Sequence, residues 1–218
     1  MGINIAIDGP AGAGKSTIAK LVAKEKGYIY VDTGAMYRGL AIHFIDQGIR
    51  PEDTDGIIEA CRSAQVTIQY EDGNQQVYLN GKNITARLRD EEVGNMASKS
   101  SPIPQVRKKL LELQQGLARE QDVIMDGRDI GTCVLPNADV KVYLTASVET
   151  RAKRRFDELT QKGIACDFEE IAKDIAERDE RDMTRETAPL KQAEDAVLID
   201  SSHMTIDEVV AAIAALCQ

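Results

Sequence analysis

The stretch from Ile3 to Thr17 constrains the fold more than any other part of the chain. Isoleucines at alternate positions predict a short buried strand, and a helical pattern begins near Lys15. Between the two, Gly9 to Ser16 reads GPAGAGKS and fits the spacing G-x-x-x-x-G-K-[ST] of a phosphate-binding loop. A strand, this loop and a helix in direct succession predict an α/β domain in which strands alternate with helices.

The chemistry of this loop follows from its residue types. Glycines allow a tight turn in which successive backbone N–H groups point at an anion, and the following helix adds its positive N-terminal end. Lys15 can bridge the β- and γ-phosphates, and the Ser16 hydroxyl can ligate Mg²⁺. The alternative is a glycine-rich turn that binds nothing, which the complete motif in this context disfavours. We therefore expect a nucleoside triphosphate here, bound by Gly9, Pro10, Ala11, Gly12, Ala13, Gly14, Lys15, Ser16 and Thr17.

Composition limits the class of protein. The 218 residues suffice for one substantial core with insertions, and 27 basic against 36 acidic residues give a net charge of -9. This charge argues against binding nucleic acid or anionic membranes. The four cysteines lie far apart without metal-ligand spacing, which is typical of free thiols in a reducing cytosol. No secretory leader is visible, and the longest apolar run, Val209 to Cys217, is too short to span a bilayer. We expect a cytoplasmic protein.

Short apolar segments alternate with helical patterns along the chain. Continuous apolarity suits strands buried on both faces of a parallel sheet. The expected strands are residues 3–8, 28–32, 122–126, 140–145 and 196–200. Helices are expected over residues 16–26, then from a Thr33 cap to Gly48, and after a capping box of Thr205 and Glu208 near the end of the chain. This alternation predicts a three-layer α/β fold.

Two segments depart from the alternation. Residues 66–85 alternate apolar and polar and contain the turn pairs Asp72-Gly73 and Asn80-Gly81, which predicts an inserted antiparallel meander. Helices are expected on either side of it, over 55–64 and 90–100. Residues 151–168 are charged, rich in arginine and interrupted by glycine, which favours a mobile helical hairpin over the site.

Polar residues follow two of the expected strands, where open α/β sheets bind their ligands. The second strand leads into DTGAMYR, residues 32–38, for which the alternative is a helix cap followed by a solvated Arg38. The third strand ends in Asp126, a Walker-B pattern that could hold Mg²⁺ directly or through water. Arg128 and Asp129 follow at once, and a solvated Arg–Asp turn is the alternative for them.

The helix expected from Asp167 to about Glu186 carries charges on its apolar face. Its apolar positions are spaced by three or four, and the same spacing continues into charged positions. The stripe consists of Phe168, Ile171, Ile175, Arg178, Asp182 and Arg185. The alternative is a surface helix with ion pairs such as Asp174–Arg178 and Arg178–Asp182. Inward charges need polar partners, and a phosphate and a ribose hydroxyl would serve.

Four segments together carry a family resemblance: GPAGAGKST, DTGAMYR, DGRDIGT and ERDERDMTRETAPL. The chain resembles, essentially end to end, the bacterial cytidylate (CMP/dCMP) kinases of the nucleoside monophosphate kinase group. The resemblance implies one P-loop kinase domain over residues 1–218, with a five-stranded parallel sheet, a monophosphate-binding insert at 36–104 containing a small antiparallel sheet, and a helical lid at 151–168. It implies transfer of a phosphoryl group from ATP to CMP or dCMP with Mg²⁺, and we expect the protein to act as a monomer.

The resemblance also implies roles for individual residues. Cytosine would be read by Thr33, Arg107 and Asp129, with Ser98, and the ribose would be held by Arg178 and Asp182. The monophosphate would be held by Arg38, Arg128 and Arg185. Arg154, with Arg151 or Arg155, would close on the transferring phosphoryl group. The catalytic residues would be Lys15, Arg128, Arg154 and Arg185, and the metal ligands Ser16 and Asp126. Serine is at least as usual as threonine at position 33, and either hydroxyl can serve.

Three rival functions are open. The nearest is another small-molecule P-loop kinase acting on UMP, AMP, dTMP or a non-nucleotide, although the predicted cytosine contacts favour CMP. A GTPase-type switch would need a guanine-reading N-K-x-D sequence, which the chain lacks, and its D-x-x-G match at Asp53–Gly56 does not follow an apolar strand. An ATP-driven nucleic-acid motor is disfavoured by the size and acidic charge of the chain.

Overall fold

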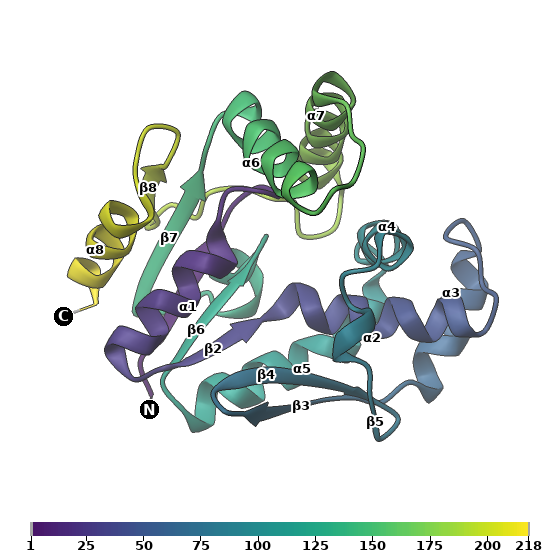
Figure 1. The fold of residues 1–218 in the computed structure, drawn as a ribbon. Helices are drawn as coiled ribbons and strands as arrows, with labels where there is room; N and C mark the ends of the chain where they lie inside the picture. The colour runs from purple at the N-terminus through teal and green to yellow at the C-terminus, as the bar shows by residue number, and fades with distance from the viewer. Residues whose placement is uncertain (1, 218) are drawn as a thin grey trace.

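The computed structural model describes residues 2–217, and its centre is a five-stranded parallel sheet in the order β2-β6-β1-β7-β8 (Figure 1). The strands are β1 (Asn4–Asp8), β2 (Ile29–Asp32), β6 (Val123–Gly127), β7 (Val140–Thr145) and β8 (Val197–Asp200). Every expected strand is confirmed, with ends within one residue of the prediction. β1 lies in the middle of the sheet, so the loop that follows it begins at the centre of the sheet's carboxyl edge.

Two apolar cores cover the two faces of this sheet, which confirms the three-layer fold. Ile5 and Ile7 of β1 pack with α1 (Lys15–Lys26) and α8 (Ile206–Leu216) on one face. Ala6, between them, faces a second core that includes α2 (Thr33–Asp46) and α5 (Pro104–Glu120). Successive side chains of a strand point to opposite faces, so continuous apolarity was the correct signal of burial on both.

A small antiparallel sheet is inserted between α2 and α5, as expected. Its strands are β3 (Val66–Glu71), β4 (Asn74–Leu79) and β5 (Lys82–Asn83). Asp72 and Gly73 both have positive φ, as do Asn80 and Gly81, which is the type I′ geometry that tight hairpins use. The neighbouring helices are α3 (Thr54–Ser63), the 3₁₀ turn η1 (Thr85–Arg87) and α4 (Glu91–Ser100).

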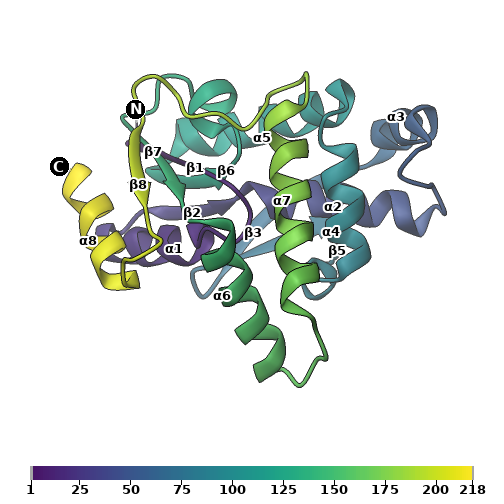
Figure 2. The ribbon, with the colours of Figure 1, turned by 90° about the horizontal axis from the view of Figure 1, so that it is seen from above.

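The hairpin region differs from its predicted bounds. α6 (Val148–Gln161) and α7 (Phe168–Thr184) pack side by side, and the connection between them contains Gly163 with φ 71° (Figures 1 and 2). The range 151–168 therefore covers most of one arm and the turn, while the second arm is the helix expected separately. The mobility of this hairpin stays a prediction.

Three local details correct or extend the expectations. Asp32, not Thr33, caps α2, because its carboxylate accepts from the N–H of Ala35. A π-helical turn, η2 (Ile130–Val134), follows β6 and was not expected. α7 ends at Thr184, so the helix stops about two residues earlier than predicted. The capping box before α8 is confirmed.

Candidate active site

The phosphate-binding loop joins the carboxyl end of β1 to the start of α1, as predicted. Gly9, Gly12 and Gly14 have φ of 151°, 78° and 90°, respectively. A Cβ on Gly9 would lie 1.9 Å from the carbonyl oxygen of Leu144, so no larger residue fits there. Gly14 precedes α1, and no side chain of the residues that the structure describes caps the N-terminus of this helix. The first N–H groups of this helix are therefore available to an anion.

The expected metal ligands lie together behind this loop. Ser16 Oγ donates to Asp126 Oδ2 at 2.9 Å, and the hydroxyl of Tyr30 donates to Asp126 Oδ1 at 2.8 Å. Burial raises the pKa of Asp126 to about 6, and the nearby carboxylate of Asp32 adds to this rise while Lys15 opposes it. Asp126 is thus a buried carboxylate whose charge calls for a cation.

These residues fit Mg²⁺ bound jointly with a nucleotide. Mg²⁺ takes oxygen ligands and commonly uses one or two protein side chains, with water and phosphate oxygens completing the shell. Ser16 and Asp126 are close enough to reach one ion together. Within residues 2–217, no group of three or more acidic, histidine or cysteine side chains could enclose a metal. The protein alone therefore provides a partial site, and the phosphates of a bound nucleotide would complete it.

Lys15 is the buried cation of the loop. Lys15 is only 5% exposed, and its ammonium group donates to the carbonyl of Pro10 at 2.8 Å. Burial lowers the pKa of Lys15 to about 7, and the positive charge of Arg128 lowers it further, whereas Asp126 and Asp8 oppose this change. Arg128 comes from the segment after β6, so the two cations approach the loop from separate parts of the chain.

The residues predicted to read the base meet at the end of β6. Arg107, on α5, forms an ion pair with Asp129, and its guanidinium lies 6.0 Å from the ring centre of Tyr37. Thr33 Oγ1 donates to the carbonyl of Asp126 at 2.7 Å. Because this bond uses the only hydroxyl hydrogen, the oxygen of Thr33 can only accept from a ligand.

A cluster of arginines gathers where α7 faces β6. Asp182 is buried and accepts from Arg128 Nε at 2.9 Å. Arg178 Nε is buried, and among residues 2–217 it has no hydrogen-bond partner. Burial lowers the pKa of Arg178 to about 10, with further lowering by Arg128, Arg38 and Arg181 and an opposing effect of Asp182. This concentration of positive charge is what a phosphate dianion would neutralise.

The surface ion pairs that were the alternative for α7 do not form in the described part of the chain. Among residues 2–217, neither Asp174–Arg178 nor Arg178–Asp182 is an ion pair, and Asp182 instead pairs with Arg128 from another segment. The expectation that Arg178 and Asp182 face inward is confirmed, because Asp182 is buried and so is the Nε atom of the half-buried Arg178.

Arg185 and Ser98 lie on the same side of the site. Arg185 is beyond the helix, in extended conformation, and its Nε donates to the carbonyl of Ala188 at 2.8 Å. Its Nη1 donates to Ser101 Oγ at 3.3 Å, and its Nη2 lies 3.8 Å from Asp129 Oδ1. Ser98 Oγ, on α4, accepts from Arg181 at 3.4 Å. The structure thus places Arg185 next to Asp129, which pairs with Arg107, and joins Ser98 to α7 through Arg181.

The three arginines considered for the lid point in different directions. Arg151 is buried, contacts the loop and pairs with Asp179 of α7. Arg154 Nη1 lies 3.5 Å from the carbonyl of Ala13, and its Nη2 donates to the carbonyl of Ser201 at 2.9 Å. Arg155 instead pairs with Glu158 at the surface. Arg151 and Arg154 therefore adjoin the loop, and Arg155 does not.

With this geometry established, comparisons with known proteins are decisive. The chain matches the model of the cytidylate kinase family over residues 5–218. A cytidylate kinase of Caldicellulosiruptor bescii is 53% identical over 207 residues, covering 95% of this chain and 92% of that protein. One from Lactobacillus gasseri is 47% identical over 216 residues, covering 99% of this chain and 94% of the relative. The chain belongs to the cytidylate kinase family.

Membership of the cytidylate kinase family confirms the predicted activity, ATP-dependent phosphorylation of CMP or dCMP. It decides against a kinase for another acceptor, a GTPase-type switch and a nucleic-acid motor. A solved shikimate kinase from Bacteroides thetaiotaomicron has a TM-score of 0.51 at 12% identity, covering 99% of this chain and 98% of that one. That likeness shows the fold alone.

Sequence reasoning missed two residues that shape this kinase site. Asp8 is buried at the end of β1, and its carboxylate accepts from the N–H groups of Ile130 and Gly131 at 2.8 and 2.7 Å. Burial raises the pKa of Asp8 to about 6. The position of Asp8, an acidic residue directly before the loop, could have marked it as a candidate site residue. Tyr30 carried none, because an aromatic residue in a buried strand predicts only packing.

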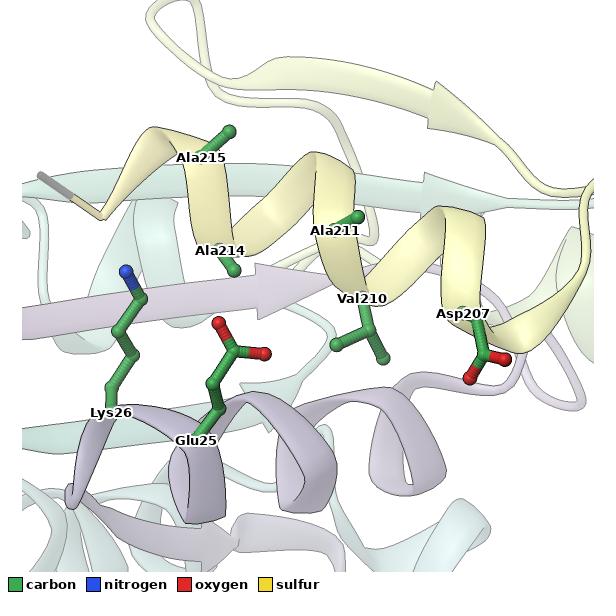
Figure 3. A pocket seen from close by; sticks show the side chains of 7 residues that line it. All are labelled: Glu25, Lys26, Asp207, Val210, Ala211, Ala214 and Ala215. Carbon is green, nitrogen blue, oxygen red and sulfur yellow. The ribbon is translucent and has the colours of Figure 1, made fainter.

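A groove of about 500 Å³ lies elsewhere, between α1 and α8 (Figure 3). Glu25 and Lys26, from the last turn of α1, face Val210 and Ala214 of α8 across it. Lys15 is at the opposite end of α1, and at about 1.5 Å per residue the groove is on the order of 15 Å from the phosphate-binding loop. The groove is therefore separate from the nucleotide site.

Two further expectations concern the whole chain. All four cysteines are free, as predicted. Between residues 2 and 217, none of the helices is both long and apolar enough to span a bilayer.

Proposed function

We propose that two adjoining half-sites perform the phosphoryl transfer, with ATP on the loop of residues 9–17 and CMP or dCMP between α2, the end of β6 and α7. The observation that supports this most is the arginine cluster around Arg178. Its buried Nε has no hydrogen-bond partner in the described part of the chain, and the charges of Arg38, Arg128 and Arg181 lower its pKa. Holding several like charges close together, one of them with a buried nitrogen, is unfavourable unless an anion neutralises them. The acceptor's phosphate is such an anion.

On the donor side, the loop amides and Lys15 bind the ATP phosphates. Ser16 and Asp126 would hold Mg²⁺, which would supply positive charge to the phosphates of the nucleotide. Tyr30 keeps the Asp126 carboxylate oriented through its hydroxyl. Burial disfavours the charged form of Asp126, and a bound cation would compensate for this, which favours metal binding here.

On the acceptor side, hydrogen-bond polarity selects the base. The Thr33 oxygen can only accept, and a carboxylate such as Asp129 also only accepts. The N4 amine of cytosine is a donor and satisfies both, whereas uracil presents an acceptor at the same position. Arg107 can donate to the ring acceptors, and Ser98 adds a hydroxyl nearby. This arrangement favours CMP and dCMP over UMP.

The remaining acceptor residues hold the sugar and phosphate. Asp182 and Arg178 would bind the ribose, while Arg38, Arg128 and Arg185 would bind the monophosphate, with Arg178 adding charge to that group. Arg128 acts on the pKa of both Lys15 and Arg178, which supports a position between the two phosphate groups. Arg128 would therefore stabilise charge on the group in transfer.

The mechanism needs no covalent intermediate and no strong base. A phosphate oxygen of CMP is already an anionic nucleophile, so positioning and charge neutralisation account for catalysis. Lys15, Arg128, Arg154 and Arg185 would supply the positive charge. A closing lid formed by residues 151–168 would exclude water, which otherwise hydrolyses ATP.

Statements about the organisation, oligomeric state, location and partners of the protein belong to the same proposal. Residues 36–104 form the monophosphate-binding insert of a single domain, and the enzyme acts as a monomer. It works in the cytoplasm, where its free thiols persist, and its acidic surface does not bind nucleic acid or membranes. Light scattering of the purified protein tests the oligomeric state.

A coupled assay of ADP release tests the acceptor assignment. Wild-type protein is given MgATP with CMP, dCMP, UMP, AMP or dTMP, and each rate is compared with that without acceptor. We expect CMP and dCMP to give the highest kcat/KM, and Thr33→Val to reduce the preference for CMP over UMP. CMP turnover no faster than the rate without acceptor would refute the proposal.

A further inference from the structure

We propose that Arg151 and Asp179 form a positioning pair that fixes α7, and with it the acceptor-binding residues, to the phosphate-binding loop. This inference rests on the proposed function of Arg178 and Asp182. It assigns to Arg151 a task other than contact with the transferring phosphoryl group. Asp179 is linked to the site through its ion pair with Arg151.

All three guanidinium nitrogens of Arg151 donate to protein atoms. Its Nε donates to the carbonyl of Ala146 at 2.9 Å, and Nη1 donates to the carbonyl of Ala11 and to Asp179 Oδ1, both at 3.0 Å. Nη2 donates to Asp179 Oδ2. The whole residue, backbone and side chain together, is 3% exposed. One planar guanidinium thus joins the end of β7, the loop and α7, and its geometry leaves little freedom.

The loop is shaped to receive this side chain. Gly12 has φ 78°, and a Cβ there would lie only 3.3 Å from Arg151 Cβ. Arg151 therefore packs against the backbone of the loop as well as donating to its carbonyl at Ala11. The contact is close enough that a shift of α6 or α7 would be transmitted to the loop.

Asp179 lies on α7 close to the two residues proposed to bind the acceptor. Asp179 directly follows Arg178 and precedes Asp182 by three residues, which is about one helical turn. A helix moves as a rigid unit over one turn, so holding Asp179 also holds the two residues proposed to bind the acceptor. Asp182 is further fixed by Arg128 at 2.9 Å.

The other ion pairs of α6 do not connect the helices. Lys153–Asp157, Arg155–Glu158 and Lys162–Glu158 all lie within α6 and its end, and all are exposed. In the described part of the chain, Arg151–Asp179 is the only ion pair between α6 and α7, with side chains 4% and 14% exposed. Buried pairs contribute little net stability but fix geometry. Catalysis depends on such geometry, since misplacement by about 1 Å can cost about 100-fold in rate.

The test compares Asp179→Asn with Asp174→Asn. Both remove one negative charge from α7, but Asp174 is exposed and forms no ion pair among the described residues. For Asp179→Asn, we expect KM for CMP to rise at least about 10-fold and kcat to fall, while KM for ATP changes less than about 3-fold. Arg151→Lys keeps the charge but cannot make the forked contact, and it should show the same rise in KM for CMP. Asp174→Asn should behave as wild type.

Hydrogen exchange provides a readout that does not depend on turnover. In Asp179→Asn, amides of α7 should exchange faster than in wild type and in Asp174→Asn, while those of the central sheet stay unchanged. Normal KM for CMP together with unchanged exchange in α7 would overturn the inference. A lowered Tm with KM values for CMP and ATP raised equally would also overturn it, because the pair would then be merely structural. Failure of wild type to use CMP would refute the proposed function instead, and exchange would still decide the role of the pair.

Discussion

Replacing Arg178 by methionine tests whether the acceptor side is a charge cluster that only a ligand satisfies. The fold lowers the pKa of Arg178 from 12.5 to about 10, chiefly because burial penalises the charge. At about 1.36 kcal/mol per pKa unit, this corresponds to at most about 3.4 kcal/mol against the charged form. The side chain is partly exposed, so screening reduces the value to about 1–2 kcal/mol. Methionine keeps much of the packing and removes the charge.

The expected result is therefore a gain in stability without ligand. A domain of this size gains about 2–4 °C in Tm per kcal/mol, so Arg178→Met should melt about 2–8 °C above wild type at pH 7.5. The pKa is lowered, so the native state binds fewer protons than the unfolded state only near pH 10–12.5, where stability rises with pH. Below pH 9 the penalty is constant, and pH 7.5 is a suitable condition.

Adding CMP should reverse the order of the two proteins. A ligand at 100 times its Kd stabilises the native state by about 2.7 kcal/mol, and wild type should gain about this much while Arg178→Met gains little. Lys173→Met is the control, since Lys173 is an exposed cation of the same helix, 3.9 Å from Glu177. A lower Tm for Arg178→Met without CMP, or an equal gain with CMP, would refute the reasoning.

Three further variants probe other parts of the site. Asp126→Asn should lose most activity. Its free energy of unfolding at pH 8 should nevertheless exceed that of wild type by up to about 3 kcal/mol, because the pKa of Asp126 is raised to about 6. A raised carboxyl pKa stabilises the native wild type fully below pH 3.8, and this stabilisation is lost as pH rises through 6. Denaturant titrations at pH 4 and pH 8 should therefore show Asp126→Asn to be more stable than wild type only at pH 8. Thr33→Val should leave the buried carbonyl of Asp126 without its donor, costing about 1–3 kcal/mol by urea unfolding, and should raise KM for CMP more than for ATP. Gly9→Ala should lose soluble expression or ATP binding, because its Cβ would lie 1.9 Å from the Leu144 carbonyl; calorimetry with ATP showing normal affinity would contradict this.

The fold was predictable where local patterns report it. The strand, the loop and Lys15 at the start of a helix follow one another in the sequence, so their geometry is local. The spacing of α7 likewise placed Arg178 and Asp182 inward. The partners could not be predicted this way, because Arg128 and Asp182 are 54 residues apart and nothing periodic in the sequence reports their meeting.

The contacts of Arg151 illustrate the same limit. An arginine in a charged segment favours a solvated side chain. This one is buried because the loop, Ala146 after β7 and Asp179 supply acceptors for all three of its guanidinium nitrogens. The loop carbonyl of Ala11 is 140 residues away. Only the assembled fold brings these acceptors to one place, so sequence identified the residue type but not its partners.

The most direct measurement follows the phosphoryl group itself. Purified protein is incubated with MgATP labelled at the γ-phosphate and with CMP, and the products are separated. The account predicts that the label appears in CDP, at a rate far above that with UMP, and that little inorganic phosphate is released. Label recovered as inorganic phosphate, with CMP unchanged, would contradict a two-nucleotide site.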